Sequence, residues 1–282
     1  MGDDMRLNAA GLTDVGRERG HNEDAIFYLV TRDARDEPLG LFIVADGVGG
    51  QMAGELASQW AVAAVRESLR DLLAPPGPAQ TTPLDAERTQ NVALSKAETV
   101  RLTPGHTLRD RAVRAVESGN LTVYAHTRER PEEAGNAGTT LTMALVHGSQ
   151  AIIANVGDSR TYLLRGDDIR QLTRDHSLVA SLVSAGNVKP EDVFTHPARN
   201  VIVRSLGREA QVEVDAFEEQ VHAGDTLLLC SDGLWEMVRD DKTIAALARG
   251  AARPMDACRA LIDAANAAGG SDNISVIVVR VE

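Results

Sequence analysis

Residues 41–50 read Leu-Phe-Ile-Val-Ala-Asp-Gly-Val-Gly-Gly, an apolar run that ends directly in an acidic, glycine-rich turn. The run is typical of a buried strand, and Asp46 is the first residue after it. A carboxylate at the end of a core strand is held on rigid scaffolding, where chemical sites are usually built. An Asp-Gly turn is common by itself, so this stretch indicates a functional site only if other stretches of the chain resemble it.

Four further motifs have the same form, an acidic residue beside Gly, Ser or Asn at the end of an apolar run. They are Asn22-Glu23-Asp24, Gly157-Asp158-Ser159-Arg160, Ser231-Asp232-Gly233-Leu234 and Ser271-Asp272-Asn273. Each alone is better explained as a turn or a cap than as a site. The positions of Asp232, directly after an apolar run, and of Asp272, directly before one, favour a shared site.

Convergence of these carboxylates would require a cation. Like charges ~4 Å apart repel by about 4 kcal/mol at an effective dielectric constant near 20, which would raise the pKa values or push the chain apart. Oxygen ligands without a set of Cys or His suit Mn²⁺ or Mg²⁺ better than zinc. The seven histidines are scattered without ligand spacing, so we expect them to be surface or structural residues.

Composition excludes several functional classes. A formal net charge of -12 repels nucleic acid and anionic membranes, so we expect neither as a partner. No apolar run approaches the ~18 residues of a membrane span, and the N-terminus lacks the apolar core of a signal peptide. Cys230 and Cys258 lie in apolar patterns and are expected to be buried in a reducing compartment. We therefore expect a cytoplasmic, monomeric protein.

The order of secondary structure predicts an α+β fold. Strand patterns occur at 25–30, 39–45, 140–146, 151–156, 161–164, 211–217, 226–230 and 273–281. Helical patterns span 51–73, follow a cap at Thr107, and run from Asp240 or Asp241 to Gly250 and from Pro254 to Gly269. Runs of strands followed by runs of helices favour antiparallel sheets with helices outside. We predict one domain over 1–282, with a Pro-rich insertion at about 74–106.

Taken in order, the five motifs resemble the metal-dependent protein phosphatases of type 2C in their bacterial form. The match runs from about Asp14 to Val279, and residues 14–24, Asp-Val-Gly-Arg-Glu-Arg-Gly-His-Asn-Glu-Asp, look like the family's opening. The resemblance implies a four-layer α-β-β-α sandwich, with two central antiparallel sheets flanked by helices and a small flap near 173–207. Val48 stands where animal members have a proposed general-acid histidine.

The resemblance also assigns roles to the acidic motifs. Asp46 matches the aspartate that bridges two metals, and the carbonyl of Gly47 joins it. Asp232 and Asp272 match the remaining ligands of the pair. Asp158 matches the ligand of a third, looser metal.

The opening stretch supplies the remaining predicted site residues. Arg19 matches the phosphate-binding arginine, whose planar guanidinium can hold two phosphoryl oxygens at once. Glu23 and Asp24 lie close to the metals, where they would orient metal-bound waters. We predict that Arg19, Asp24 and Asp46 are catalytic, because they hold phosphate and metals at the reacting centre.

These roles imply a protein serine/threonine phosphatase that uses two Mn²⁺ or Mg²⁺ ions, with a third bound more loosely. A metal-activated water would hydrolyse phosphoserine and phosphothreonine in proteins, opposing a bacterial Ser/Thr kinase. One alternative is a catalytically weak regulator of the same fold that binds phosphoproteins. Another is a two-metal hydrolase of small phosphate esters, which is disfavoured because aromatic residues make up only 3% of the chain and no Walker-type loop occurs.

Overall fold

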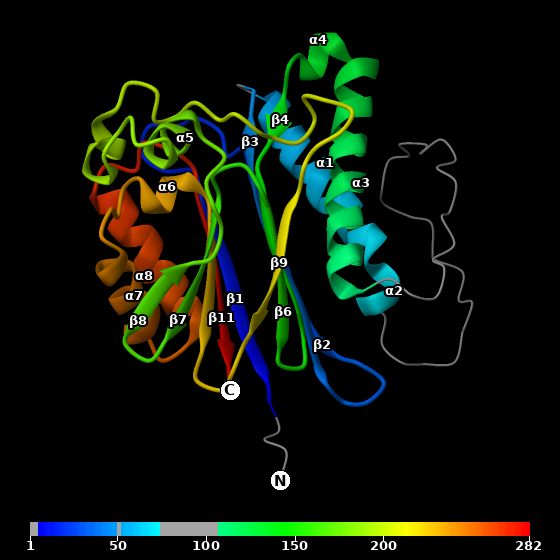
Figure 1. The fold of residues 1–282 in the computed structure, drawn as a ribbon, viewed down its shortest axis with the longest axis vertical. Coiled ribbons are helices and arrows are strands. Elements are labelled where there is room, and N and C mark those ends of the chain that lie inside the picture. Colours follow the sequence, from blue (N-terminus) through cyan, green and yellow to red (C-terminus); the bar gives the residue numbers. More distant parts are fainter. Residues whose placement is uncertain (1–4, 50–51, 74–106) are drawn as a thin grey trace.

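Two antiparallel sheets form the centre of the structure, a computed structural model that describes residues 5–49, 52–73 and 107–282 (Figure 1). One sheet has the order β1 (Leu7–Asp14), β11 (Ile274–Val281), β10 (Thr226–Cys230), β7 (Arg160–Arg165) and β8 (Asp168–Gln171). The other has the order β2 (Asp24–Arg32), β3 (Pro38–Val48), β5 (Leu141–His147), β6 (Gln150–Val156) and β9 (Asp215–Gln220). The short strand β4 (Gly138–Thr139) pairs with the end of β3.

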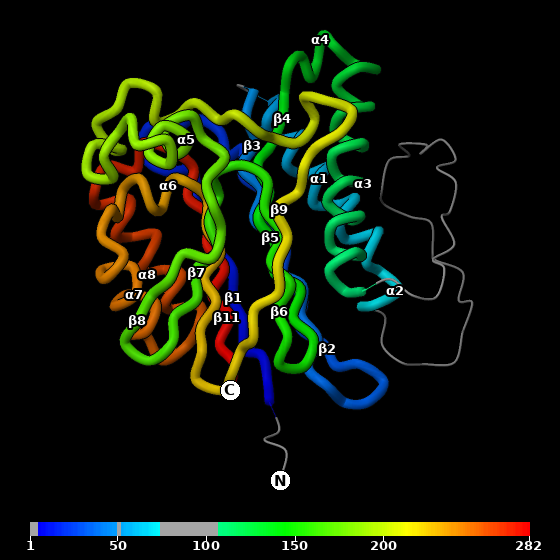
Figure 2. Tube along the Cα trace, in the orientation of Figure 1, coloured from blue at the N-terminus to red at the C-terminus, as the bar shows by residue number. Residues whose placement is uncertain are grey.

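Helices cover the outer face of each sheet, as Figures 1 and 2 show. The β3 sheet carries α1 (Met52–Ser68), α2 (Arg70–Leu73), α3 (Leu108–Glu129) and α4 (Pro131–Ala134). The β11 sheet carries α6 (Asp232–Trp235), α7 (Asp241–Gly250) and α8 (Pro254–Ala267). The predicted sandwich of two antiparallel sheets between helical layers is therefore confirmed. The predicted Pro-rich insertion at 74–106 lies outside the described residues.

Strand β3 shows why the sheets stack. Its residues 38–45 are buried without interruption, because both faces of the strand are covered. Leu41 and Ile43 join the core between this sheet and helices α1 and α3, whereas Phe42 and Val44 point into the core between the two sheets. A shift of one residue in register would exchange these two sets of side chains, so the buried pattern fixes the register.

Capping residues define the helix starts that the sequence predicts. The Thr107 hydroxyl accepts a hydrogen bond from the Asp110 backbone N–H, and the Asp110 carboxylate accepts one from Thr107 in return. Asp240 caps α7 by accepting from the backbone N–H groups of Lys242 and Thr243. Pro254 is the first residue of α8, as expected.

The predicted strand at 211–217 is wrong in its first half. Val212 and Val214 do pack against the core, but the ladder with β6 begins only at Asp215, which pairs with Asn155. Strand β6 ends at Val156, so residues 211–214 have no strand beside them. The alternating apolar residues at 211–214 therefore indicate burial of Val212 and Val214, not pairing with a neighbouring strand.

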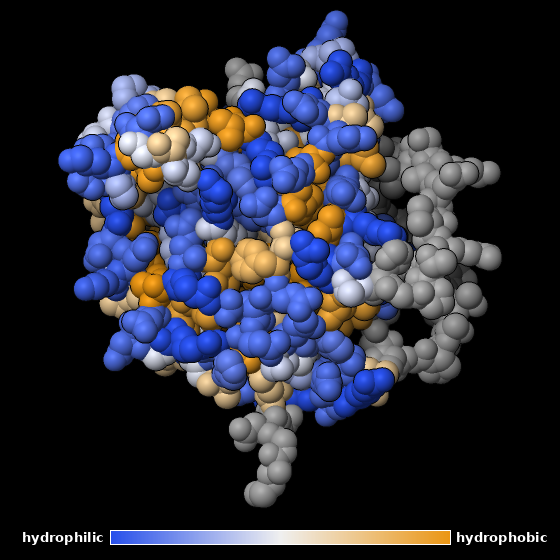
Figure 3. All heavy atoms as spheres, in the orientation of Figure 1, coloured by the Kyte–Doolittle hydropathy of each residue, from blue (hydrophilic) through white to orange (hydrophobic). Residues whose placement is uncertain are grey.

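Segment 173–207, the predicted flap, contains the short helix α5 (Leu178–Ser184) and a 3₁₀ helix at Pro190–Thr195. It joins β8 to the segment that leads into β9, and α5 lies at the same end of the sandwich as α6 (Figure 1). Leu178, Val201 and Val203 are exposed there. Figure 3 shows apolar residues on the surface at this end of the molecule.

Candidate active site

The five acidic motifs meet at one end of the sandwich, because their aspartates lie at or within two residues of a strand end and neighbouring strands are antiparallel. Asp24 begins β2 and is paired directly with Asp46 of β3. Thr140, at the start of β5, donates its backbone N–H to the Asp46 carbonyl, which places the start of β5 at this end. In the second sheet Cys230 lies opposite both Arg160 and Val276, so Asp158, Asp232 and Asp272 approach the same end. The upper part of Figure 1 shows this end.

Asp24 links the two sheets. Its side chain is 8% exposed, and its Oδ2 accepts a 2.8 Å hydrogen bond from the hydroxyl of Ser231, which precedes α6. The pKa of Asp24 is raised to about 6, mainly by burial; the charges of Asp272 and Glu23 act in the same direction, and hydrogen bonds from serine hydroxyls oppose the shift. A nearby positive charge would therefore favour the ionised form of the Asp24 carboxyl near neutral pH.

Asp46 and Asp232 form a close pair of carboxyl groups. Burial raises both pKa values well above the usual range, and the negative charges of nearby aspartates add to the shift. A hydrogen bond between the two side chains contributes to both values. Two carboxyl groups in such contact share a proton unless a cation lies between or beside them.

Asp158 is the most buried of the predicted acidic residues, with 2% of its surface exposed. Burial raises its pKa to about 7, and the charge of Asp175 acts in the same direction. The Trp235 indole donates a 3.1 Å hydrogen bond to the Asp158 carbonyl, which fixes the backbone here. The Arg160 guanidinium lies 3.6 Å from the centre of that indole ring and bonds Asp175, so it braces the same loop.

Asp272 faces Arg19 across the site. The Arg19 Nη2 atom lies 2.7 Å from the Asp272 Oδ2, and the arginine side chain keeps 52% of its surface exposed. The other Asp272 oxygen, Oδ1, accepts the backbone N–H of Asn273 at 2.8 Å. Arg19 is thus attached to the site by one carboxylate while its solvent side stays accessible.

Two glycines allow helix α1 to press against the end of β3. A Cβ at Gly47 would lie 2.2 Å from the Gly54 carbonyl oxygen, and a Cβ at Gly54 would lie 1.9 Å from the Glu23 Oε2. The Gly47 N–H and the Ser58 hydroxyl both donate to the Glu23 carbonyl, at 3.2 Å and 2.6 Å. The carboxylate of Glu23 and the backbone of Gly47 are therefore packed together against the first turn of α1.

Three buried carboxylate oxygens at this end have no hydrogen-bond partner among the described residues. They are Asp24 Oδ1, Asp158 Oδ1 and Asp232 Oδ1. Buried acceptors without donors are costly and are normally satisfied by a proton, a water or an ion. The atoms that could bind a metal here are all oxygens, and the pKa values of these three aspartates are raised. Both features are expected of a site for hard divalent cations.

Sequence reasoning missed the residue that ties this end together. The Asn273 side chain accepts the Glu23 N–H at 2.8 Å and donates to the carbonyls of Val15 and His21, both at 2.9 Å. It lies in the quoted Ser-Asp-Asn motif, where it was interpreted as an ordinary turn or cap. Ser231 was also interpreted as a turn residue, yet its hydroxyl holds Asp24. Their partners are more than 200 residues away, so local patterns could not reveal them.

Two arginines near this end pair with carboxylates, and the two cysteines are buried as expected. Arg160 pairs with Asp175 at 2.6 Å, and Arg199 lies 3.7 Å from Glu236. Cys230 and Cys258 are fully buried in apolar surroundings. Burial raises the pKa of both thiols, which keeps them protonated.

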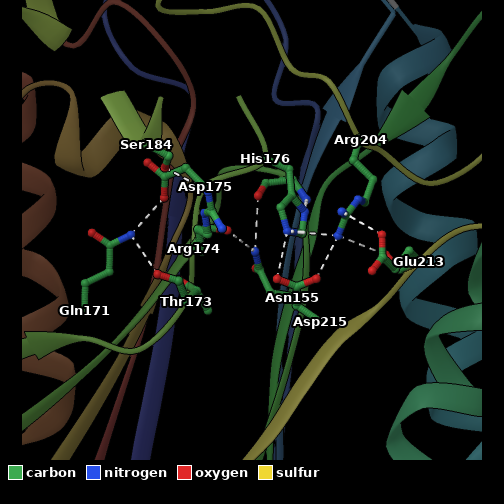
Figure 4. A network of polar contacts seen from close by, with 11 residues as sticks. Asn155, Gln171, Thr173, Arg174, Asp175, His176, Ser184, Arg204, Glu213 and Asp215 are labelled. Atoms are coloured by element: carbon green, nitrogen blue, oxygen red, sulfur yellow. Dashed lines mark hydrogen bonds and ion pairs between the residues drawn. The ribbon is translucent and has the colours of Figure 1, made fainter. Parts of the chain in front are cut away.

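A network of polar contacts anchors the root of the flap to the loop that carries Asp158 (Figure 4). The His176 Nδ1 accepts the backbone N–H of Gly157 at 3.1 Å, so the ring hydrogen lies on Nε2, which faces Asp215 at 3.2 Å. Arg204 donates to the other oxygen of Asp215 at 2.7 Å, so His176 and Arg204 share this carboxylate. Burial lowers the pKa of His176, consistent with a neutral ring that positions the backbone at Gly157.

A different cluster of ligand-type atoms lies at the opposite end of the β3 sheet. Asp33, Glu37 and His147 come from the β2–β3 and β5–β6 turns, and they are the one such trio within 4.8 Å among the described residues. The His147 Nε2 lies 2.9 Å from Asp33, and this hydrogen bond, with backbone N–H groups of Glu37 and Arg35, lowers the pKa of Asp33 to about 2. Pairing between histidine and aspartate accounts for the contact, and the trio is separate from the five acidic motifs.

The fold and this end of the sandwich together define a class of protein, a two-sheet α+β domain with carboxylates gathered where the strands end. Comparison with known proteins identifies the family. The family described as protein phosphatase 2C matches residues 17–266. A serine/threonine phosphatase, stp, of Listeria innocua is 36% identical over 274 residues, which cover 97% of this chain and 96% of that protein. The chain belongs to the protein phosphatase 2C family.

Solved structures agree with this assignment. The serine/threonine phosphatase Stp1 from Staphylococcus aureus has a TM-score of 0.77 and 32% identity, covering 98% of this chain and 95% of that one. The catalytic domain of the phosphatase PstP in complex with two manganese ions has a TM-score of 0.75 and 32% identity, covering 98% and 99%. Of the helices in the described ranges, none has the length and apolar composition that a membrane crossing requires.

Proposed function

We propose that the protein is a metal-dependent serine/threonine phosphatase that acts on phosphorylated proteins. One observation carries the proposal: buried carboxylate oxygens from both sheets converge without hydrogen-bond donors, in a chain of the protein phosphatase 2C family. The manganese ions in the PstP catalytic domain support Mn²⁺ as a cofactor here, with Mg²⁺ as the chemically similar choice.

The residues that would hold the cations are the predicted ones. Asp46, the carbonyl of Gly47, Asp232 and Asp272 supply oxygens for a pair of ions, and Asp158 supplies one for a third. When bound, the ions supply positive charge that stabilises the phosphoryl oxygens and makes a water molecule more acidic. Glu23 and Asp24 stand beside these ligands, where their carboxylates can orient the reacting water.

Arg19 binds the substrate phosphate in this proposal. Its guanidinium is half exposed and attached to Asp272 at one nitrogen, so its remaining N–H groups are free to meet phosphoryl oxygens. Asn273 fixes the backbone around Arg19 and Glu23 by bonding Val15, His21 and Glu23. The chain thus positions the phosphate beside the cation site through hydrogen bonds that span both sheets.

The alternative, a phosphoprotein-binding regulator without turnover, receives less support. A loss of metal-binding carboxylates would favour it, and all of the predicted carboxylates are present. The relatives named above are serine/threonine phosphatases. We propose that the protein acts as a monomer in the cytoplasm, where it opposes a Ser/Thr kinase by removing phosphate from the proteins that the kinase modifies.

Hydrolysis of a phosphothreonine peptide and of p-nitrophenyl phosphate with Mn²⁺, Mg²⁺ or EDTA tests this function. We expect turnover with Mn²⁺, none with EDTA, and a loss of at least ~100-fold in Asp232→Asn. Asp256→Asn is the matched control, because Asp256 pairs with Arg253 on the exposed side of α8. No turnover with either metal in the folded wild-type protein would contradict the proposal and favour the regulator.

A further inference from the structure

A polar cavity lies at the same end of the molecule as the candidate active site. Its volume is about 580 Å³, and its walls come from the end of α3, from α4, from the segment that leads into β4, and from the turn at residues 207–208. The lining includes Arg128 and Arg208 together with Thr127, Asn136, Ala137 and Gly207. None of the phosphatase site residues lines it.

The two arginines give this cavity a positive lining on an acidic protein. No carboxylate is among its lining residues, although the whole chain carries a formal net charge of -12. Within the described part of the chain, neither Arg128 nor Arg208 forms an ion pair, and the one recorded contact of Arg128 is with the ring of Tyr124 at 5.1 Å. The nearby Arg130 differs, because it pairs with Glu133. Two unpaired guanidinium groups that share a cavity favour an anionic ligand.

The backbone around the cavity is rigid. A Cβ at Gly207 would lie 2.3 Å from Val123 of α3, and the Gly207 N–H donates to the Asn120 side chain at 2.8 Å. Gly207 also has a φ of +88°, which favours glycine. The turn that carries Arg208 is therefore fixed against α3, which carries Arg128, so the backbone holds the two exposed arginines on the same cavity.

The cavity lies close to the end of β3 that carries Asp46. Val48 pairs with Gly138 of β4, and an added Cβ at Gly49 would lie 2.9 Å from the Cα of Ala137, which lines the cavity. Gly49 is three positions after Asp46 in the sequence, about 10 Å of extended chain. An extended peptide advances ~3.3–3.6 Å per residue, so this offset corresponds to about three residues of bound substrate. In Figure 1, α4 and β4 lie at the same end as α6.

We infer that this cavity binds a second anionic group of the phosphoprotein substrate, about three residues from the phosphoserine or phosphothreonine that is hydrolysed. The inference rests on the proposed phosphatase function, because the position of the first phosphate defines the spacing. The anionic group is the carboxylate of an acidic side chain or a second phosphate, since guanidinium groups bind both. The cavity thus selects substrates with acidic or multiply phosphorylated sequences around the target residue.

Phosphothreonine peptides with Ala, Glu, Lys or phosphoserine placed two to four residues to either side of the target test this specificity. With wild-type protein and Mn²⁺, we expect kcat/KM to be about tenfold higher for Glu or phosphoserine at one of these offsets than for Ala, mostly through KM. Arg128→Ala with Arg208→Ala should remove the preference. Arg130→Ala is the control, because it removes a nearby arginine that is not part of the lining. Hydrolysis of p-nitrophenyl phosphate should be unchanged in all variants.

A charge reversal makes the test sharper. Arg128→Glu with Arg208→Glu should shift the preference at the same offset from Glu to Lys. Anisotropy of fluorescent peptides that carry a non-hydrolysable phosphonate measures the same preference as binding, even if turnover fails. Equal discrimination by wild-type protein and both double variants would overturn the inference while leaving p-nitrophenyl phosphate hydrolysis intact. Loss of that hydrolysis in wild-type protein would instead count against the proposed function.

Discussion

At the scale of single residues, the candidate site depends on side chains that would not themselves contact a substrate. Asn273 connects three separate segments, Val15, His21 and Glu23, through hydrogen bonds of 2.8–2.9 Å. Its own side chain is 5% exposed, so water cannot easily replace those bonds. A single amide therefore controls where Arg19 and Glu23 lie relative to Asp272.

Substitution of the Asn273 side chain should lower the stability of the folded protein. We expect Asn273→Ala to lower the free energy of unfolding by about 3 kcal/mol, because three partly buried hydrogen bonds are lost and their partners stay unpaired. Urea denaturation followed by circular dichroism measures this change. Asn8→Ala, which removes one exposed hydrogen bond to Glu282, should cost less than about 1 kcal/mol. Equal losses in the two variants would show that Asn273 does not organise the site.

At the scale of elements, the site depends on how closely α1 approaches β3. The contact at Gly47 and Gly54 leaves no space for a Cβ on either side. This close approach brings the first turn of the helix against Glu23. It also explains why a helix that packs mainly through Ala57, Ala61 and Val65 has a glycine in its first turn, at its contact with the strand.

An added methyl group at this contact should reduce metal affinity. Alanine normally stabilises a helix by about 1 kcal/mol relative to glycine, but in Gly54→Ala it would displace the Glu23 carboxylate. We expect the Mn²⁺ concentration for half-maximal activity to rise at least ~10-fold, and calorimetric titration with Mn²⁺ gives the affinity directly. Gly250→Ala is the matched control, since nothing lies within 4 Å of a Cβ at the end of α7. Unchanged affinity in Gly54→Ala would refute the role of this contact.

At the scale of the whole molecule, the distribution of acidic groups makes stability depend on pH. Burial raises the pKa of Asp24 to about 6 and that of Asp158 to about 7, and it raises those of Asp46 and Asp232 well above the usual 3.8. Between pH 4 and 7 the folded state therefore binds more protons at these groups than the unfolded state does. Stability must fall as pH rises through this range.

We expect the metal-free protein, kept in chelator, to lose free energy of unfolding between pH 4 and pH 7, by about 1.4 kcal/mol per pH unit for each carboxyl that stays protonated only when folded. His176 acts in the opposite direction because its pKa is lowered, and so do aspartates with lowered pKa values such as Asp33, although the aspartates act mainly below pH 4. Urea denaturation at several pH values measures the slope. Saturating Mn²⁺ should reverse it, because the cation binds the ionised carboxylates. A slope of zero or of opposite sign without metal would contradict the burial of these groups.

The sequence alone predicts those features that depend on residues close together in the chain. The helix starts at Thr107, Asp240 and Pro254 follow from capping rules that involve residues a few positions apart. The apolar run before Asp46 predicts a buried strand, because this pattern too involves only neighbouring residues. Strand β1, by contrast, has the unremarkable sequence Leu-Asn-Ala-Ala-Gly-Leu-Thr-Asp, and it exists because all eight of its residues pair with β11.

The sequence by itself determined which carboxylates lie at strand ends, the kind of ion that they suit and, through the order of its motifs, the family. Only the tertiary structure decided that Ser231 and Asn273 hold the site together, that Gly54 must be small, and that Arg128 and Arg208 share a cavity. The physical reason is the range of the interactions. Caps and strand patterns join neighbours along the chain, whereas hydrogen bonds such as that between Asn273 and Glu23 join residues that only folding brings together.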